Sequence, residues 1–212
     1  IGARNREEVE KKGILPGTPI TLDRDFKHLL NGRVTGKALD DRVGIAMMIE
    51  GVRQSKTNAT IYAVGTVQEE VGLKGARTSA FGLEPNVAIV SEVSIAGDHP
   101  GIENKQSPLK LGKGPSITVA DASGRGLITP ANVLKWITET AKEEKIPYQL
   151  DVSESGTTDA AAIHISKAGI PCGVISVPTR YMHSGIEVIE MEDIKNGAIL
   201  IAKSLERVRN YF

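Results

Sequence analysis

The sequence predicts an α/β protein in which helices sandwich a largely parallel β-sheet. From about residue 36 to the end of the chain, apolar runs of strand length alternate with longer segments whose apolar residues recur at the helical period. The apolar runs contain few polar residues, as strands covered on both faces should. A chain of 212 residues is long enough to bury the core that such a fold needs.

The elements of this fold follow one another along the chain. The segment 40–54 has apolar residues at helical spacing, and Asp40 or Asp41 can cap its first turn. Thr129 followed by Pro130 is typical of a helix start, with the threonine as cap. Helices are therefore expected at 40–54, 129–146, 156–169 and 192–210, and strands at 60–68, 86–93, 148–155 and 171–178, with an extra strand and loop within 111–126.

Residues 1–35 differ from the rest of the chain. Glycine and proline interrupt short alternating pieces there, which indicates turn-rich β structure. The segment is too short to enclose a core of its own. We therefore expect either the C-terminal part of a small β domain or an edge packed on the main domain, which would occupy residues 36–212.

The composition argues against several classes of partner. Lysine plus arginine (26) balances aspartate plus glutamate (26), and aromatic residues make up 4%, so neither nucleic acid nor an anionic membrane is an expected partner. No apolar stretch approaches a membrane span, and no signal peptide is visible. The single cysteine, Cys172, lies in an apolar run and predicts a buried thiol in a reducing, cytoplasmic compartment. Because the first residue is Ile rather than Met, the chain is expected to be a fragment of something longer.

Acidic and imidazole side chains fall at one predicted edge of the sheet. Asp40 precedes the first helix, Glu69 and Glu70 close one strand, Glu92 closes the next, and His183 follows the last. Ligands of open α/β sheets gather beyond the carboxyl ends of the strands. Without a counter-charge, bringing these carboxylates together would cost roughly several kcal/mol. One or two divalent cations solve this most simply, and carboxylate plus histidine ligation suits Zn²⁺, Co²⁺ or Mn²⁺.

Two adjacent glutamates can have different functions in a metal site, because one binds the cation while the other stays free to accept a proton from water.

Other residues allow both a structural and a functional interpretation. Gly156, Thr157 and Thr158 precede a helix, so they are either an ordinary N-terminal cap or a rail for the main chain of a substrate. His99, on a loop after the Glu92 strand, is a candidate for lining the substrate cleft.

Five segments carry a resemblance to a known family: GKALDDRVG at 36–44, VQEEVGLKGA at 67–76, SEV at 91–93, GTTDA at 156–160 and RYMHS at 180–184. In this order they resemble the tetrahedral aminopeptidases, the glutamyl-aminopeptidase-like branch of the dinuclear metallopeptidases, some of which are catalogued as endoglucanases. The match runs from about Ile1 to the C-terminus. It implies a catalytic α/β domain with an inserted β domain, whose closing portion would be the N-terminal segment.

The resemblance also implies roles for individual residues. Asp40 would bridge two divalent metal ions, zinc or cobalt, and Glu70 and His183 would complete one of the two sites. Glu92, where family members often have Asp, would belong to the other site, and Glu69 would be the general base.

One departure from the family pattern limits what this chain can hold. The family uses a further histidine, in a His-x-Asp segment that precedes the inserted domain, and nothing in this chain corresponds to it. We therefore expect one complete metal site within the 212 residues.

A metal-dependent aminopeptidase is the function that these observations favour. By resemblance, the substrate is a peptide with a free N-terminus, and dimers are expected to assemble into a hollow complex of twelve subunits. Two alternatives stay open. Glu69 and Glu92 suit the acid/base pair of a glycoside hydrolase, although that interpretation leaves Asp40 and His183 without roles. The other alternative is an inactive metal-binding subunit.

Overall fold

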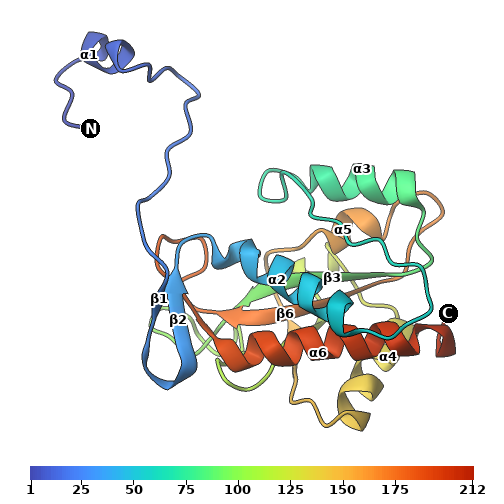
Figure 1. Ribbon diagram of the computed structural model, residues 1–212. Coiled ribbons are helices and arrows are strands. Elements are labelled where there is room, and N and C mark those ends of the chain that lie inside the picture. The colour runs from blue at the N-terminus through green and yellow to red at the C-terminus, as the bar shows by residue number, and fades with distance from the viewer.

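A computed structural model describes all 212 residues, which form an α/β body with an N-terminal extension (Figure 1). The helices are α1 (Arg6–Lys11), α2 (Leu39–Gln54), α3 (Lys74–Leu83), α4 (Ala131–Glu143), α5 (Ala160–Ile163) and α6 (Met191–Arg207). The strands are β1 (Lys27–His28), β2 (Arg33–Gly36), β3 (Ala88–Ile95), β4 (Ser116–Ala120), β5 (Gln149–Val152), β6 (Cys172–Thr179) and β7 (Glu187–Glu190). No helix combines the length and the apolar character that crossing a membrane requires.

The main sheet has four strands in the order β3-β6-β4-β5. β3 pairs with β6 in parallel, β4 pairs with β5 in parallel, and the two pairs meet at an antiparallel junction between β4 and β6. All eight residues of β6 are buried, as expected of an apolar strand inside a sheet. The predicted α/β class with a mostly parallel sheet is therefore confirmed.

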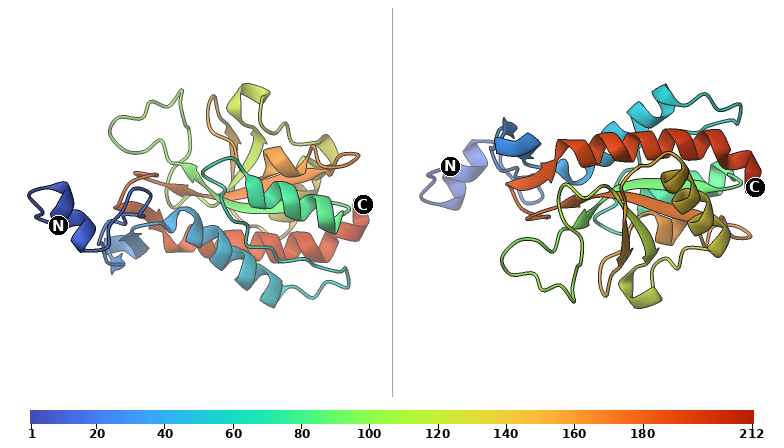
Figure 2. Two further views of the ribbon diagram at one scale, coloured as in Figure 1. Left: turned by 90° about the horizontal axis from the view of Figure 1, so that it is seen from above. Right: turned by 90° about the horizontal axis from the view of Figure 1, so that it is seen from below.

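Helices cover both faces of this sheet (Figures 1 and 2). α2 and α6 pack against each other on one face, with α4 beside α6, and α5 lies on the other face with α3 next to it. The larger core lies under α2, α4 and α6 and contains the fully buried Trp136 and Met47. The Nε1–H group of Trp136 donates a hydrogen bond to the carbonyl oxygen of Ser204, so this large side chain is buried with its polar atom satisfied.

The N-terminal segment differs from the expected turn-rich β structure because it contains α1. Asn5 caps this helix by accepting a hydrogen bond from the N–H of Glu8, and ion pairs between residues four apart support it. α1 buries no residue and extends away from the body (Figure 1). The end of the segment does form β structure, since β2 pairs with β1 on one side and with β7 of the main domain on the other. The domain boundary at residue 35 stays a prediction.

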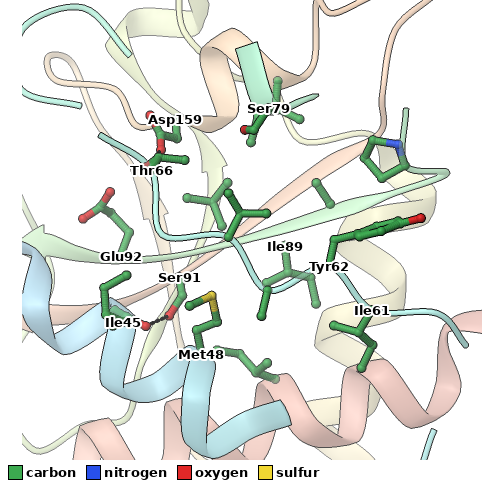
Figure 3. Close-up of a pocket in the computed structure, with 18 of the residues that line it drawn as sticks. Ile45, Met48, Ile61, Tyr62, Thr66, Ser79, Ile89, Ser91, Glu92 and Asp159 are labelled. Carbon is green, nitrogen blue, oxygen red and sulfur yellow. Dashed lines mark hydrogen bonds between the residues drawn. The ribbon is translucent and has the colours of Figure 1, made fainter. Parts of the chain in front are cut away.

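The strand predicted at 60–68 is wrong. These residues form no strand, and the backbone of residues 60–66 makes no hydrogen bond within the chain. An apolar cavity of about 520 Å³ lies between this segment, α2 and the free edge of β3, with Ile45, Tyr62 and Ile89 among its lining (Figure 3). A strand requires a neighbour that accepts and donates its backbone hydrogen bonds, and this segment pairs with no strand, because the cavity separates it from the free edge of β3.

Several helix ends also differ from the expectation. Thr129 does not cap α4, because its hydroxyl donates to the carbonyl oxygen of Thr118 and the helix begins one residue after Pro130. The helix expected at 156–169 shortens to the four residues of α5. β7 was not expected as an element. The other predicted helices and strands are present with ends shifted by a few residues.

Candidate metal centre and acidic cavity

Asp40, Glu70 and His183 converge although they come from three separate segments. Asp40 lies at the start of α2, Glu70 lies in the loop before α3, and His183 lies between β6 and β7. The Nε2 atom of His183 lies 3.2 Å from Oδ2 of Asp40 and 3.5 Å from Oε2 of Glu70, and one potential ligand atom of each residue lies within 4.8 Å of the others. Two carboxylates and an imidazole at this spacing form a donor set that suits a zinc site with three protein ligands.

A buried glutamate that the sequence analysis did not single out positions two of these residues. Glu187, 2% exposed, accepts hydrogen bonds on Oε2 from the backbone N–H groups of Leu39 and Asp40, at 2.6 and 3.1 Å. Its Oε1 accepts from the backbone N–H of His183 at 3.2 Å. One carboxylate therefore ties the start of α2 to the histidine loop. No sequence signal marks Glu187, because its partners are backbone groups, and two of them, at Leu39 and Asp40, are distant along the chain.

The two adjacent aspartates in the first turn of α2 contact different partners. Asp40 and Asp41 have non-helical backbone angles, and the peptide between them is cis. Oδ1 of Asp41 accepts a hydrogen bond from the N–H of Gly44 and so caps the helix. Gly44 allows α2 to approach β3, because a Cβ atom there would lie 2.3 Å from the carbonyl oxygen of Ser91. Asp40 is left to face the other two converging residues, and burial together with the charge of Glu70 raises its pKa to about 6.

Glu92 lies against Asp41 rather than within the converging group. Its side chain is 7% exposed, and Oε1 accepts a hydrogen bond from the N–H of Val93. Burial is the main cause that raises the pKa of both Glu92 and Asp41. The charge of Asp41 adds to the effect on Glu92, and the charge of Asp40 adds to the effect on Asp41, so the pair retains a proton in the metal-free chain. The structure therefore brings together Asp40, Glu70 and His183 and leaves Glu92 apart from them.

Glu69 is half-buried and has the proton affinity of a base that works near neutral pH. Burial raises its pKa to about 7, and the negative charges of Asp159, Glu70 and Asp40 add to this effect. Asp159 is itself held by the hydroxyl of Thr66, which donates to its Oδ2, while its buried Oδ1 has no partner (Figure 3). A carboxylate with a pKa near the working pH suits general-base catalysis.

The converging residues open into a second cavity of about 440 Å³, here called the acidic cavity. Its lining contains seven carboxylates and no lysine or arginine. These acids are Asp40, Glu69, Glu70, Glu92, Asp121, Asp151 and Glu154. Between them lie backbone and hydroxyl groups, including the predicted Gly156, Thr157 and Thr158. The cavity therefore favours cationic and hydrogen-bonding ligands and disfavours anions.

The predicted substrate residues differ in their surroundings. The hydroxyl of Thr157 donates to Oδ2 of Asp121, and that of Thr158 accepts from the N–H of Ala160 in the manner of a cap. His99 does not line either cavity described above. It lies on an exposed loop, with its ring 4.7 Å from the ring of Tyr181.

Comparison with known proteins places this geometry in a family. The model of the M42 glutamyl aminopeptidase family matches residues 1–200. A lysyl aminopeptidase of Pyrococcus furiosus is 38% identical over 207 residues, which are 97% of this chain and 57% of that protein. Among solved structures, an aminopeptidase of Desulfurococcus kamchatkensis has 43% identity and a TM-score of 0.91, over 97% of this chain and 57% of that one. A TET aminopeptidase of a marine-sediment thaumarchaeon has 38% identity and a TM-score of 0.92, over 100% of this chain and 61% of that one.

A further solved structure describes an assembly. A TET1 peptidase of Pyrococcus horikoshii, described as able to form a tetrahedron or a large octahedral shell, has 30% identity and a TM-score of 0.68, over 85% of this chain and 52% of that one. The chain spans little more than half the length of the curated relatives that it matches, 54–60% for the first three. The family match nevertheless extends over almost the whole chain. The chain therefore belongs to the M42 glutamyl aminopeptidase family.

Proposed function

We propose that this chain is the metal-binding part of an aminopeptidase that removes N-terminal residues from peptides. The observation that carries the proposal is the convergence of Asp40, Glu70 and His183 at one end of the acidic cavity. Family membership supports the class of reaction. The donor set fits a zinc or cobalt ion, because three protein ligands leave a coordination position open, as catalytic sites require. When bound, such an ion polarises a carbonyl group and lowers the pKa of water.

Other side chains of this chain would transfer the proton and bind the substrate. Glu69, with its pKa near 7, would accept a proton from the attacking water and return it to the leaving amine. The negative charge of the acidic cavity would attract the ammonium group of a free peptide N-terminus. Gly156, Thr157 and Thr158 would contact the main chain of the substrate. Glu92 would bind a second ion together with Asp40.

That second ion is expected to bind more weakly in this chain. Asp40 and Glu92 are the only ligands that we assign to it, whereas the first ion has three. An oligomer of twelve subunits, built from dimers, is proposed by analogy with the assemblies described for the TET relatives. A cytoplasmic location is proposed from the reduced, buried Cys172.

Two measurements test the proposal. Zinc titration should show about one tightly bound equivalent, which His183→Ala removes and which His28→Ala, a change at an exposed histidine on β1, does not. Hydrolysis of aminoacyl anilides should require metal, and Glu69→Gln should lower kcat by roughly 10²–10⁴-fold while the zinc content stays the same.

Three results of these assays would contradict the proposal. Unchanged zinc binding in His183→Ala would exclude the assigned metal centre. Equal turnover by Glu69→Gln at saturating metal would exclude Glu69 as the base. Cleavage of glycosides without cleavage of anilides would favour the glycoside hydrolase instead.

A further inference from the structure

Asp151 is a buried carboxylate without a hydrogen-bond or salt-bridge partner. It lies on β5 opposite Thr118 of β4, its side chain is 7% exposed, and it forms neither a hydrogen bond nor an ion pair within the chain. Its neighbours Leu150 and Val152 point to the opposite, exposed side of this edge strand. Asp151 lines the acidic cavity together with Thr118. Its carboxylate oxygens are not enclosed by protein atoms and face the cavity, so a cationic ligand in the cavity would supply the direct partner that the chain does not.

Asp121 adds a second, immobilised negative charge to this part of the cavity. Its Oδ1 accepts a hydrogen bond from the N–H of Leu127 at 2.5 Å, and its Oδ2 accepts from the hydroxyl of Thr157 at 3.0 Å. Gly126 makes this arrangement possible, because a Cβ atom at that position would lie 2.0 Å from Oδ1. Burial raises the pKa of Asp151, and the charge of the neighbouring Asp121 adds to this effect. With its oxygens already engaged, Asp121 contributes charge, while Asp151 offers free acceptors.

The ligand that fits this place is a cation other than a metal ion. Asp121 and Asp151 do not belong to a group of three or more residues close enough to hold a metal ion, since the chain has one such group, at Asp40. No lysine or arginine lines the cavity, and the ion pair between Glu154 of the lining and Lys105 is exposed and 3.8 Å long. An organic ammonium or guanidinium group donates hydrogen bonds to a single carboxylate without needing further ligands.

We propose that Asp151, assisted by the charge of Asp121, binds the side-chain ammonium or guanidinium group of a substrate whose N-terminal residue is lysine or arginine. This specificity rests on the proposed aminopeptidase function, since the metal centre and Asp151 line the same cavity. The family description says glutamyl and the Pyrococcus furiosus relative is a lysyl enzyme, so names alone leave the preference open. The charge of the cavity favours a basic N-terminal residue over an acidic one, because a glutamate side chain would face carboxylates without a lysine or arginine to pair with.

Binding of free amino acids tests the proposal without requiring turnover. The zinc-loaded chain is titrated calorimetrically with L-lysine, with L-norleucine, which has the same carbon skeleton without the side-chain ammonium, and with L-glutamate. Lysine should bind roughly 10- to 100-fold more tightly than norleucine, the range expected for hydrogen bonds to a charged group, and glutamate should bind most weakly. Asp151→Asn should abolish the advantage of lysine over norleucine. Glu154→Gln, which removes an exposed acid from the same cavity, should preserve it.

Each alternative result overturns the assignment. Equal affinity for lysine and norleucine, or no measurable binding of lysine at millimolar concentration, excludes a cation site. A lysine advantage that survives in Asp151→Asn excludes Asp151 as its origin. Zinc titration and anilide hydrolysis report on the proposed function separately, so a functioning metal centre with no preference for lysine refutes only the specificity.

Discussion

A buried carboxylate without a partner should make the ligand-free chain less stable than its amide variant. Burial and the charge of Asp121 raise the pKa of Asp151 from 3.8 to about 6. The folded chain therefore holds this proton more tightly than the unfolded chain, and the free energy of unfolding falls as the pH rises between these two values. A shift of about 2 pKa units corresponds to about 3 kcal/mol of stability lost above pH 6.

Asp151→Asn should recover this free energy, because an amide resembles the protonated acid in shape and stays neutral at every pH. Urea denaturation at pH 8 should show the variant to be more stable by about 3 kcal/mol, or by about 6–12 °C in Tm for a chain of this size. At pH 5 the difference should shrink to roughly half. Glu154→Gln, at an exposed position, should change stability by less than about 0.5 kcal/mol. A variant no more stable than the original at pH 8 would show that the carboxylate of Asp151 has a partner, and would refute the reasoning.

Two further predictions concern the metal centre. The pKa values of Asp40, Asp41 and Glu92 are raised, so the free energy of unfolding of the metal-free chain should fall as the pH rises from about 4 towards 8. Zinc at 100 times its Kd should raise this free energy by about 2.7 kcal/mol at pH 8. Melting curves at pH 5 and 8 with and without zinc check this, and His183→Ala should remove the effect of zinc. Glu187→Gln should weaken zinc binding roughly 10- to 100-fold, because one of the two oxygens that position the ligand backbones becomes a donor. Competition with a chromophoric chelator measures this, and an unchanged affinity relative to Glu192→Gln, an exposed acid on α6, would contradict the positioning role.

The parts of the fold that could be predicted are those whose signal is local and repeated. α6 has a long amphipathic period, and β6 is an uninterrupted apolar run, so both were expected near their observed places. The segment 60–68 has an equally strong strand pattern but pairs with no strand, because a cavity separates it from the free edge of β3. α1 shows the reverse case, because its cap and its pairs of opposite charges are visible in the sequence, but the surrounding glycines and prolines favoured turns.

The residues of the candidate site also differ in how far the sequence reveals them. Asp40 and His183 could be singled out because each adjoins an element whose position is predictable, whereas Glu70 was singled out at the end of a strand that does not form. Glu187 and Asp151 could not, since their importance depends on which backbone groups and charges the fold brings near them. A charged residue within the predicted strand at 148–155 was nevertheless a visible anomaly, because a buried strand position is unfavourable for an ionised side chain.

The overall neutrality of the chain conceals a strong separation of charge. The 26 lysines and arginines balance the 26 acids in number, yet none of them lines the acidic cavity, whereas seven acids do. Hydrogen bonds from the backbone fix the carboxylates of Glu187, Asp41 and Asp121, but they leave those of Asp40, Glu70 and Asp151 facing the cavity. The carboxylates of Asp40 and Asp151 lower the stability of the empty chain, because burial raises the pKa of both, and a bound cation would remove this cost. The same arrangement that makes the ligand-free chain less stable would therefore provide the proposed affinity for a metal ion at Asp40 and Glu70 and for a basic side chain at Asp151.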